Sequence, residues 1–198
     1  MEIQIATNEN FRAHQGFDIV PWKGDPSNPA YPRSFRVARS MTVSEVISLA
    51  AREMGLNPDF CRPWLMAGRQ NHTVRPDQPL EALDVTIEEA AARSGAKMLP
   101  FRIWLESTEE KDEEGNPIWR DLHLDRDGLP SNKPVLLFLK YFDVDAQTLL
   151  GVTHFYAQWQ DKIVDIIPTV LKIMDLSEET QLRFYEVHQR RIGLQIIC

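Results

Sequence analysis

Along residues 1–107, segments whose apolar residues have the spacing of strands are interspersed with segments whose apolar residues have the spacing of helices. Ile3 and Ile5 alternate with polar residues within 1–7, and Phe35 and Val37 do so within 34–39, which predicts two strands. The stretch between them carries six Gly or Pro residues. Because these residues interrupt ladders and helices alike, we expect a surface loop there.

A helix is predicted from residue 43 onward. Thr42 and Glu45 have the spacing of a capping box, in which each side chain bonds the other residue's backbone N–H, and Gly55 provides a stop. Between them the apolar residues follow one helical stripe, namely Val43, Val46, Ile47, Ala50 and Met54.

Three further elements follow before residue 107. Residues 60–66 are predicted to form a strand, Thr86 and Glu89 cap a short Ala-rich helix, and residues 101–106 alternate as a strand. The predicted order is therefore strand, strand, helix, strand, short helix, strand.

A run of acidic residues then marks a boundary. Residues 109–116 hold five acids around the single Lys111, and Asp, Gly, Pro and Ser follow down to residue 133. Such a composition is typical of a solvated linker. We therefore predict one domain over 1–107, an acidic linker over 108–133 and a second domain over 134–198.

The second domain repeats the first in a shortened form. Strands are predicted over 135–143 and 152–157, and a helix over 163–174 that contains Pro168. Its apolar positions match those of the first domain at one constant offset, which also places Phe184 opposite Trp64 in a following strand. Residues 194–198 are apolar and are expected to close the second sheet, although the segment before them is short.

Composition narrows the classes of partner. The net charge of −7 repels nucleic acid and anionic lipid and favours proteins with Lys/Arg-rich segments. The longest apolar run, 135–139, is far too short to span a bilayer, and the polar start does not resemble a signal peptide. With two cysteines, no disulfide framework is expected, and we predict a location in the nucleus and cytoplasm.

The sequence offers no catalytic residue, cofactor site or metal site. Cys61 lies on a predicted strand, where a packed cysteine is far more common than a nucleophile, and no two histidines have metal-ligand spacing. The acidic run has two interpretations, a solvated linker or a docking site for a basic peptide.

The order of elements is that of ubiquitin, and several motifs resemble the first two ubiquitin-like domains of the herpesvirus-associated ubiquitin-specific protease (HAUSP) family in its fungal form. Those of the first domain are Met1 to Ala6, His14-Gln15-Gly16 and Arg62-Pro63-Trp64-Leu65-Met66. Those of the second are Leu136 to Asp143, Lys162 to Pro168 and Phe184-Tyr185-Glu186. The resemblance implies an α+β protein with two tandem β-grasp domains, the second shortened at its C-terminus.

The resemblance also implies a function in protein deubiquitination without catalysis by this chain. The family keeps its catalytic residues in a separate papain-like domain, whose motifs this sequence lacks, so we expect the chain to be inactive alone. The family's second ubiquitin-like domain presents an acidic surface that starts at Tyr-Glu-Glu. Here Tyr185-Glu186 is followed by Val187. The candidate partner-binding residues are Glu186, Glu109, Glu110, Glu113 and Glu114.

Two functions stay open at this point. The chain is either the non-catalytic partner-recruiting region of a ubiquitin-specific cysteine protease, or a free-standing ubiquitin-like adaptor from a shortened gene.

Overall fold

The computed structural model describes residues 1–68, 73–93, 100–120, 134–185 and 195–197. They fall into two units: unit 1 comprises residues 1–14 and 18–119, and unit 2 comprises residues 15–17 together with the chain from 120 onward. Each unit has its own β-sheet and its own helix-covered core. The predicted α+β class is confirmed. None of the helices in these ranges is long and apolar enough to cross a membrane.

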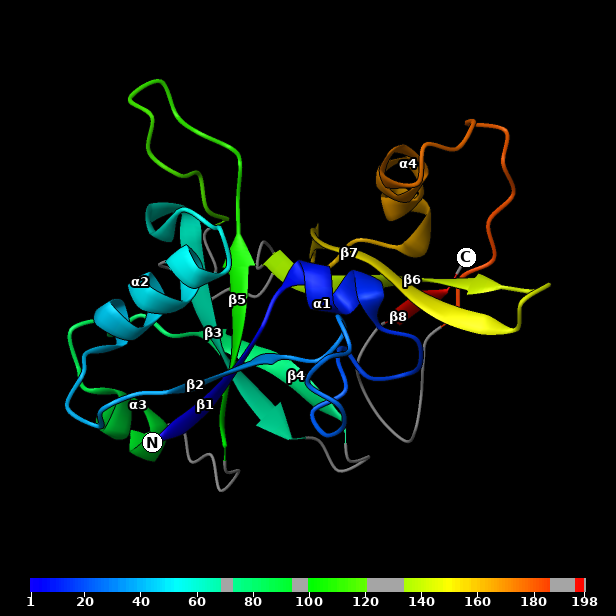
Figure 1. Ribbon diagram of the computed structural model, residues 1–198. Helices are drawn as coiled ribbons and strands as arrows, with labels where there is room; N and C mark the ends of the chain where they lie inside the picture. The colour runs from blue at the N-terminus through cyan, green and yellow to red at the C-terminus, as the bar shows by residue number, and fades with distance from the viewer. Residues whose placement is uncertain (69–72, 94–99, 121–133, 186–194, 198) are drawn as a thin grey trace. The chain divides into compact units, whose positions relative to one another are not determined.

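Unit 1 contains a five-stranded mixed sheet in the order β2-β1-β5-β3-β4 (Figure 1). Its strands are β1 (Glu2–Ala6), β2 (Arg33–Arg36), β3 (Cys61–Gly68), β4 (Val74–Pro79) and β5 (Phe101–Ser107). The central pair, β1 and β5, is parallel, and all other neighbours are antiparallel. Strand β4 was not predicted, because Pro76 and Pro79 are residues that sequence reasoning assigns to turns.

The two capping patterns of unit 1 form the predicted helices. At α2 (Val43–Glu53), Glu45 N donates to Thr42 Oγ1 at 3.2 Å and Thr42 N donates to Glu45 Oε2 at 2.8 Å. The same reciprocal bonds join Thr86 and Glu89 at the start of α3 (Ile87–Arg93). Beyond α2 the chain turns at Gly55, whose φ of +73° favours glycine.

The main core of unit 1 lies between α2, α3 and one face of the sheet. Alternate strand residues point into it because side chains in a strand have a period of two. They include Ile3 and Ile5 of β1 and Phe101, Ile103 and Leu105 of β5. The predicted alternation is therefore confirmed for both strands.

The opposite face of the same sheet is buried as well, which the sequence did not indicate. Its strand residues alternate with those of the main core, and six of them are less than 9% exposed: Gln4, Ala6, Trp64, Met66, Trp104 and Glu106. A strand with one solvated face carries polar residues there. Two tryptophans among the six instead show that this face is covered.

The chain between β1 and β2 covers this second face, which corrects the prediction that it is a surface loop. It contains a short helix, α1 (Asn8–Ala13), with buried Phe11. Beyond it, Tyr31 Oη accepts a hydrogen bond from Gln4 Nε2 at 2.9 Å, and the Arg102 guanidinium lies 4.8 Å from the centre of the Trp22 ring. Four apolar residues of the loop are themselves buried: Ile19, Val20, Trp22 and Ala30.

Unit 2 has a three-stranded sheet in the order β7-β6-β8, with α4 (Ile163–Ile173) packed on it. The strands are β6 (Pro134–Asp143), β7 (Thr148–Gln158) and β8 (Gln195–Ile197), and β8 runs parallel to β6. The predicted closing strand is therefore confirmed. Leu137, Leu139 and Val170 are among the residues of its core.

The strand expected at Phe184 does not form within the described residues up to 185. Phe184 is half-buried and packs against the core of unit 2 without joining the sheet. The chain length explains this difference. The segment between Leu176 and β8 is less than half as long as the one between the equivalent Leu56 and β5, so it is too short for a two-strand arm and its return.

Candidate functional site

The acidic segment of unit 1 is an ordered hairpin that leaves the end of β5. Thr108 N donates to Phe60 O at 3.1 Å, and Ile118 N donates to Glu110 O at 3.0 Å. An antiparallel bridge between Lys111 and Pro117 joins the two arms. Residues 108–119 therefore pack with unit 1, while residues 121–133 of the predicted linker lie outside the described ranges.

Asp112 organises the tip of the hairpin. Its Oδ1 accepts hydrogen bonds from Asn116 N at 2.7 Å and from Glu114 N at 3.0 Å, and its Oδ2 accepts one from Asn116 Nδ2 at 3.1 Å. These hydrogen bonds lower the pKa of Asp112, and the one from Asn116 N makes the largest contribution. Gly115, at φ +89°, closes the turn. The signal that sequence reasoning missed is Asp112 followed by Gly115-Asn116, a pattern typical of turns.

Aromatic contacts fix the base of the hairpin to the sheet. Lys111 Nζ lies 5.6 Å from the centre of the Phe60 ring. The Arg62 guanidinium lies 4.6 Å from the Trp119 ring and 5.4 Å from the Trp64 ring, both within the range of cation–π attraction.

Arg62 is held in turn by a buried carboxylate. Glu106 Oε2 accepts hydrogen bonds from Arg62 Nε at 2.9 Å and from Trp64 Nε1 at 2.7 Å, and it forms an ion pair with Arg62 Nη2 at 2.9 Å. The side chain of Glu106 is 5% exposed and that of Arg62 is 16% exposed. A buried charge with such partners is strongly anchored. The hairpin is thereby attached to a rigid part of unit 1.

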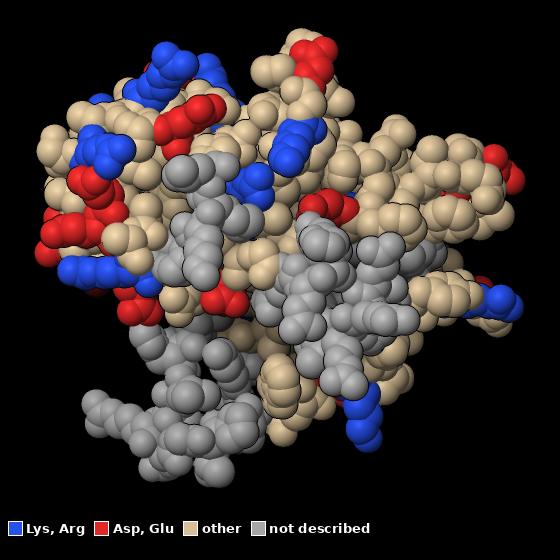
Figure 2. Space-filling model, turned by 90° about the horizontal axis from the view of Figure 1, so that it is seen from below, with Lys and Arg blue, Asp and Glu red and all other residues tan. Residues whose placement is uncertain are grey.

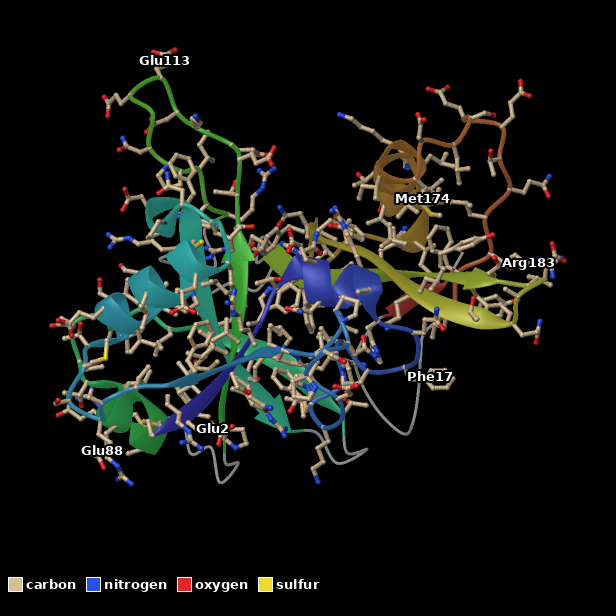
Figure 3. The ribbon with its side chains drawn as sticks, in the orientation of Figure 1. Glu2, Phe17, Glu88, Glu113, Met174 and Arg183 are labelled. Carbon is tan, nitrogen blue, oxygen red and sulfur yellow. The ribbon has the colours of Figure 1, made fainter. Side chains whose placement is uncertain are left out.

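Four exposed glutamates project from this hairpin, and we call them the acidic turn: Glu109, Glu110, Glu113 and Glu114. Figure 3 shows Glu113 at the tip, with its carboxylate directed away from the rest of unit 1. Among the described residues, none of the four forms an ion pair. The coloured part of the face in Figure 2 shows acidic and basic side chains interspersed. The acidic turn is thus a local concentration of charge that is available to a partner.

Glu186, the remaining candidate, lies outside the described residues. Tyr185, directly before it, is described and is 55% exposed.

Cys61 has the environment of a packed strand cysteine. It opens β3, contacts the main core of unit 1, and its Sγ donates to Asn57 O at 3.3 Å. Burial raises the pKa of its thiol to about 11, which keeps the sulfur protonated near neutral pH. Within the described ranges, no three His, Cys, Asp or Glu side chains gather as metal ligands do.

A family of partner-binding domains matches most of the chain. Residues 61–197 match the family model described as the ICP0-binding domain of ubiquitin-specific protease 7. The matched range begins at β3 in unit 1 and ends at β8 in unit 2, so it includes both the acidic turn and α4.

Ubiquitin hydrolases of a yeast, a plant and an insect resemble the chain over nearly its full length. It is 28% identical to ubiquitin carboxyl-terminal hydrolase 5 of Schizosaccharomyces pombe over 185 residues, which cover 93% of this chain and 16% of that protein. It is 25% identical to ubiquitin C-terminal hydrolase 12 of Arabidopsis thaliana, covering 93% of this chain and 16% of that protein. It is 23% identical to ubiquitin carboxyl-terminal hydrolase 7 of Drosophila melanogaster, covering 94% and 15% respectively. The chain thus spans about one-sixth of the length of these relatives.

Proposed function

The chain belongs to the family of the ICP0-binding domain of ubiquitin-specific protease 7, and from this membership we propose that it is a non-catalytic, partner-recruiting region of a ubiquitin-specific cysteine protease. In this role it binds proteins with Lys/Arg-rich segments and brings them to a protease domain that removes ubiquitin. The nucleus and cytoplasm are the proposed location.

The observation that carries this proposal is the acidic turn on its anchored hairpin. Its four carboxylates are exposed, and Asp112 and Arg62 fix the loop that bears them. A preorganised loop loses little conformational entropy when a partner binds, and its negative field speeds the approach of a basic segment. Attraction between exposed charges also weakens with salt. The proposal therefore predicts binding that is electrostatic and salt-sensitive.

Titration with a Lys-rich peptide tests the acidic turn. Replacing all four of its glutamates by Gln removes four exposed charge interactions of about 0.3–0.5 kcal/mol each, which together weaken binding roughly tenfold at low salt. The unmodified chain should also bind more weakly at 0.3 M salt than at 0.05 M. Glu186→Ala, measured in the same way, tests the remaining candidate residue.

A charge-matched control separates the acidic turn from overall charge. The control variant changes four other exposed glutamates to Gln, and these are Glu2, Glu9, Glu178 and Glu179. We expect it to change affinity less than twofold. Equal losses in both variants, or binding that ignores salt, would show that the acidic turn is not the docking site.

A free-standing adaptor is the second candidate function, because the same domains without a protease still bind partners. The two candidates differ in one observation, namely whether the gene encodes a protease domain in the same polypeptide. Purified chain should in either case release no fluorophore from ubiquitin-fluorophore conjugates. Turnover that disappears in Cys61→Ala would contradict both candidates.

A further inference from the structure

Helix α4 of unit 2 corresponds to α2 of unit 1 position by position. Both helices are 11 residues long, and in both the N-cap backbone N–H donates to a carboxylate three residues later at 2.8 Å. Both also end in the same way, because the backbone N–H of the leucine that follows donates to the last turn, at 2.8 Å in α2 and 2.9 Å in α4. Val43 of α2 therefore corresponds to Ile163 of α4, and Ile47 corresponds to Ile167.

In unit 1 the start of α2 is covered by the segment that leads into α3. Val43 is 0% exposed and Ile47 is 5% exposed, and Ile87 of α3 shares their core. Residues 83–88 also make four backbone hydrogen bonds of 2.8–3.4 Å with residues 39–44: Val43 N to Val85 O, Ser44 N to Leu83 O, Ile87 N to Met41 O and Glu88 N to Arg39 O.

The corresponding start of α4 carries apolar side chains without such a cover. Ile163 is 48% exposed and Val164 is 63% exposed, and Trp159 in the preceding turn is 66% exposed. Residues 177–185, which follow α4, make none of the four corresponding backbone bonds. Within the described part of the chain, the N–H groups of Ile163 and Val164 and the carbonyl oxygens of Trp159 and Asp161 therefore lack a hydrogen-bond partner.

This apolar surface is held in a defined position. Asp161 N donates to Gln158 O at 3.0 Å, and Asp161 Oδ2 accepts a hydrogen bond from Gln158 N at 2.7 Å, so the turn before α4 is ordered. Figure 1 shows α4 on one side of the sheet of unit 2, and Ile166 and Val170 fill the core between them. A helix with apolar residues on more than one side buries more than one side. The exposed start of α4 is thus a second apolar surface of this helix.

The charges around this surface favour a basic partner. Trp159 takes the place of Arg39, which pairs with Glu88 in unit 1 at 2.6 Å. A Lys or Arg in place of Glu88 instead gains cation–π attraction to the indole ring. A second copy of this chain is disfavoured, because its equally acidic surface repels the first. Residues 159–180 carry a net charge of −3 from five acids and two lysines: Asp161, Asp165, Asp175, Glu178, Glu179, Lys162 and Lys172.

We propose that the start of α4, formed by Trp159, Ile163 and Val164, is a docking site for a partner segment that resembles residues 83–93 of unit 1. The segment consists of an extended piece that leads into a short amphipathic helix, with Lys or Arg where unit 1 has Glu88. Its backbone supplies the four missing hydrogen bonds. Its apolar residues take the places of Val85, Ile87 and Ala90. The site goes beyond the proposed function, because it lies on unit 2 and depends on apolar burial and not on the acidic turn.

A synthetic peptide added to the full chain tests this site. The probe has the sequence of residues 80–93 with Glu88→Lys, which is Leu-Glu-Ala-Leu-Asp-Val-Thr-Ile-Lys-Glu-Ala-Ala-Ala-Arg. In NMR titrations, amide shifts of Ile163 and Val164 and the indole N–H shift of Trp159 report its binding. The amide of Val43 should not shift, because unit 1 already contains its own segment there. The peptide that keeps Glu88 should bind at least threefold more weakly.

Substitutions in α4 and elsewhere in unit 2 separate this surface from exposed apolar residues in general. Val164→Asp should weaken binding of the probe at least tenfold, because it places a charge in the apolar contact. An acid in the first turn suits the helix dipole, so α4 should still form. Val144→Asp is the matched control, since Val144 is 69% exposed in the turn between β6 and β7, and it should change affinity less than twofold.

Absence of shifts at Ile163 and Val164 would overturn the proposal, as would equal losses in Val164→Asp and Val144→Asp or equal binding of the two peptides. If Val164→Asp fails to fold, as judged by the spread of its amide spectrum, Trp159→Ala replaces it. That variant shortens an exposed side chain in a turn and should weaken binding at least fivefold. Binding of the Lys-rich peptide to the acidic turn should be unchanged in all of these variants, so the two proposals are tested separately.

Discussion

The ion pair between Arg62 and Glu106 should be a main source of stability in unit 1. Three donors converge on Glu106 Oε2, and the carboxylate is nearly inaccessible to water. Arg62→Met leaves that carboxylate buried without its cation, a change that typically costs about 3–5 kcal/mol. Because Arg62 is 16% exposed and the Trp64 bond remains, we expect about 3 kcal/mol.

A second substitution separates loss of charge pairing from loss of packing. In the Arg62→Met background, Glu106→Gln removes the buried charge and should recover about 1–2 kcal/mol of the free energy of unfolding. If Arg62 acts through packing on Trp64 and Trp119 alone, Glu106→Gln gives no recovery.

Urea unfolding followed by tryptophan fluorescence measures these effects. Four of the five tryptophans belong to unit 1, and Trp159→Phe removes the remaining one, which is 66% exposed in unit 2. Arg39 and Glu88 form an ion pair at 2.6 Å with side chains 69% and 55% exposed, and they serve as the control. With Arg39→Met and Glu88→Gln, the coupling free energy between the two substitutions should be below about 0.5 kcal/mol. Equal coupling at the two pairs, or a cost of Arg62→Met below about 1 kcal/mol, would refute the reasoning.

Two further predictions concern single residues. In a Cys198→Ser background, iodoacetamide should modify Cys61 about a hundredfold more slowly at pH 8 than it modifies an unhindered thiol, because a pKa of about 11 leaves little thiolate. The rate of modification should rise as the pH approaches 11. A rate within tenfold of that of the free thiol at pH 8 would contradict the burial of Cys61. Thr42→Ala should lower the free energy of unfolding of unit 1 by about 1 kcal/mol because the α2 cap is lost, whereas Thr42→Ser should keep most of the stability that the cap provides. Equal free energies of unfolding for the two variants in urea would argue against capping.

Local patterns in the sequence predicted the elements whose signals lie within a few residues. The capping pair Thr42 and Glu45 identified the start of α2, and the alternation of Phe101, Ile103 and Leu105 identified a core face. The helix α1 was missed because it is six residues long and buries Phe11 alone. In a segment this short, the apolar residues are too few to show the helical spacing that identifies longer helices.

Contacts between distant residues were not predictable from local pattern. Nothing near Glu106 in the sequence indicates that Arg62, 44 residues away, pairs with it. The loop before β2 contains Pro and Gly, which favour a surface position, yet Ile19, Val20 and Trp22 give it enough apolar area to cover a sheet face. The exposure of the four acidic-turn glutamates was predicted from their charge, whereas their placement on an anchored hairpin depends on Arg62 and Trp119.

The parallel pairing of β1 with β5 determines when unit 1 can fold during synthesis. Strand β1 leaves the ribosome before the other strands of this sheet, and its central partner begins only at Phe101. At about 5–20 residues per second, translation of the intervening chain takes roughly 5–20 s. During that time Ile3 and Ile5 have β2 as their one available neighbour in the sheet. Until β5 emerges, Ile3 and Ile5 can bury their side chains against α2, with which they share the main core of unit 1.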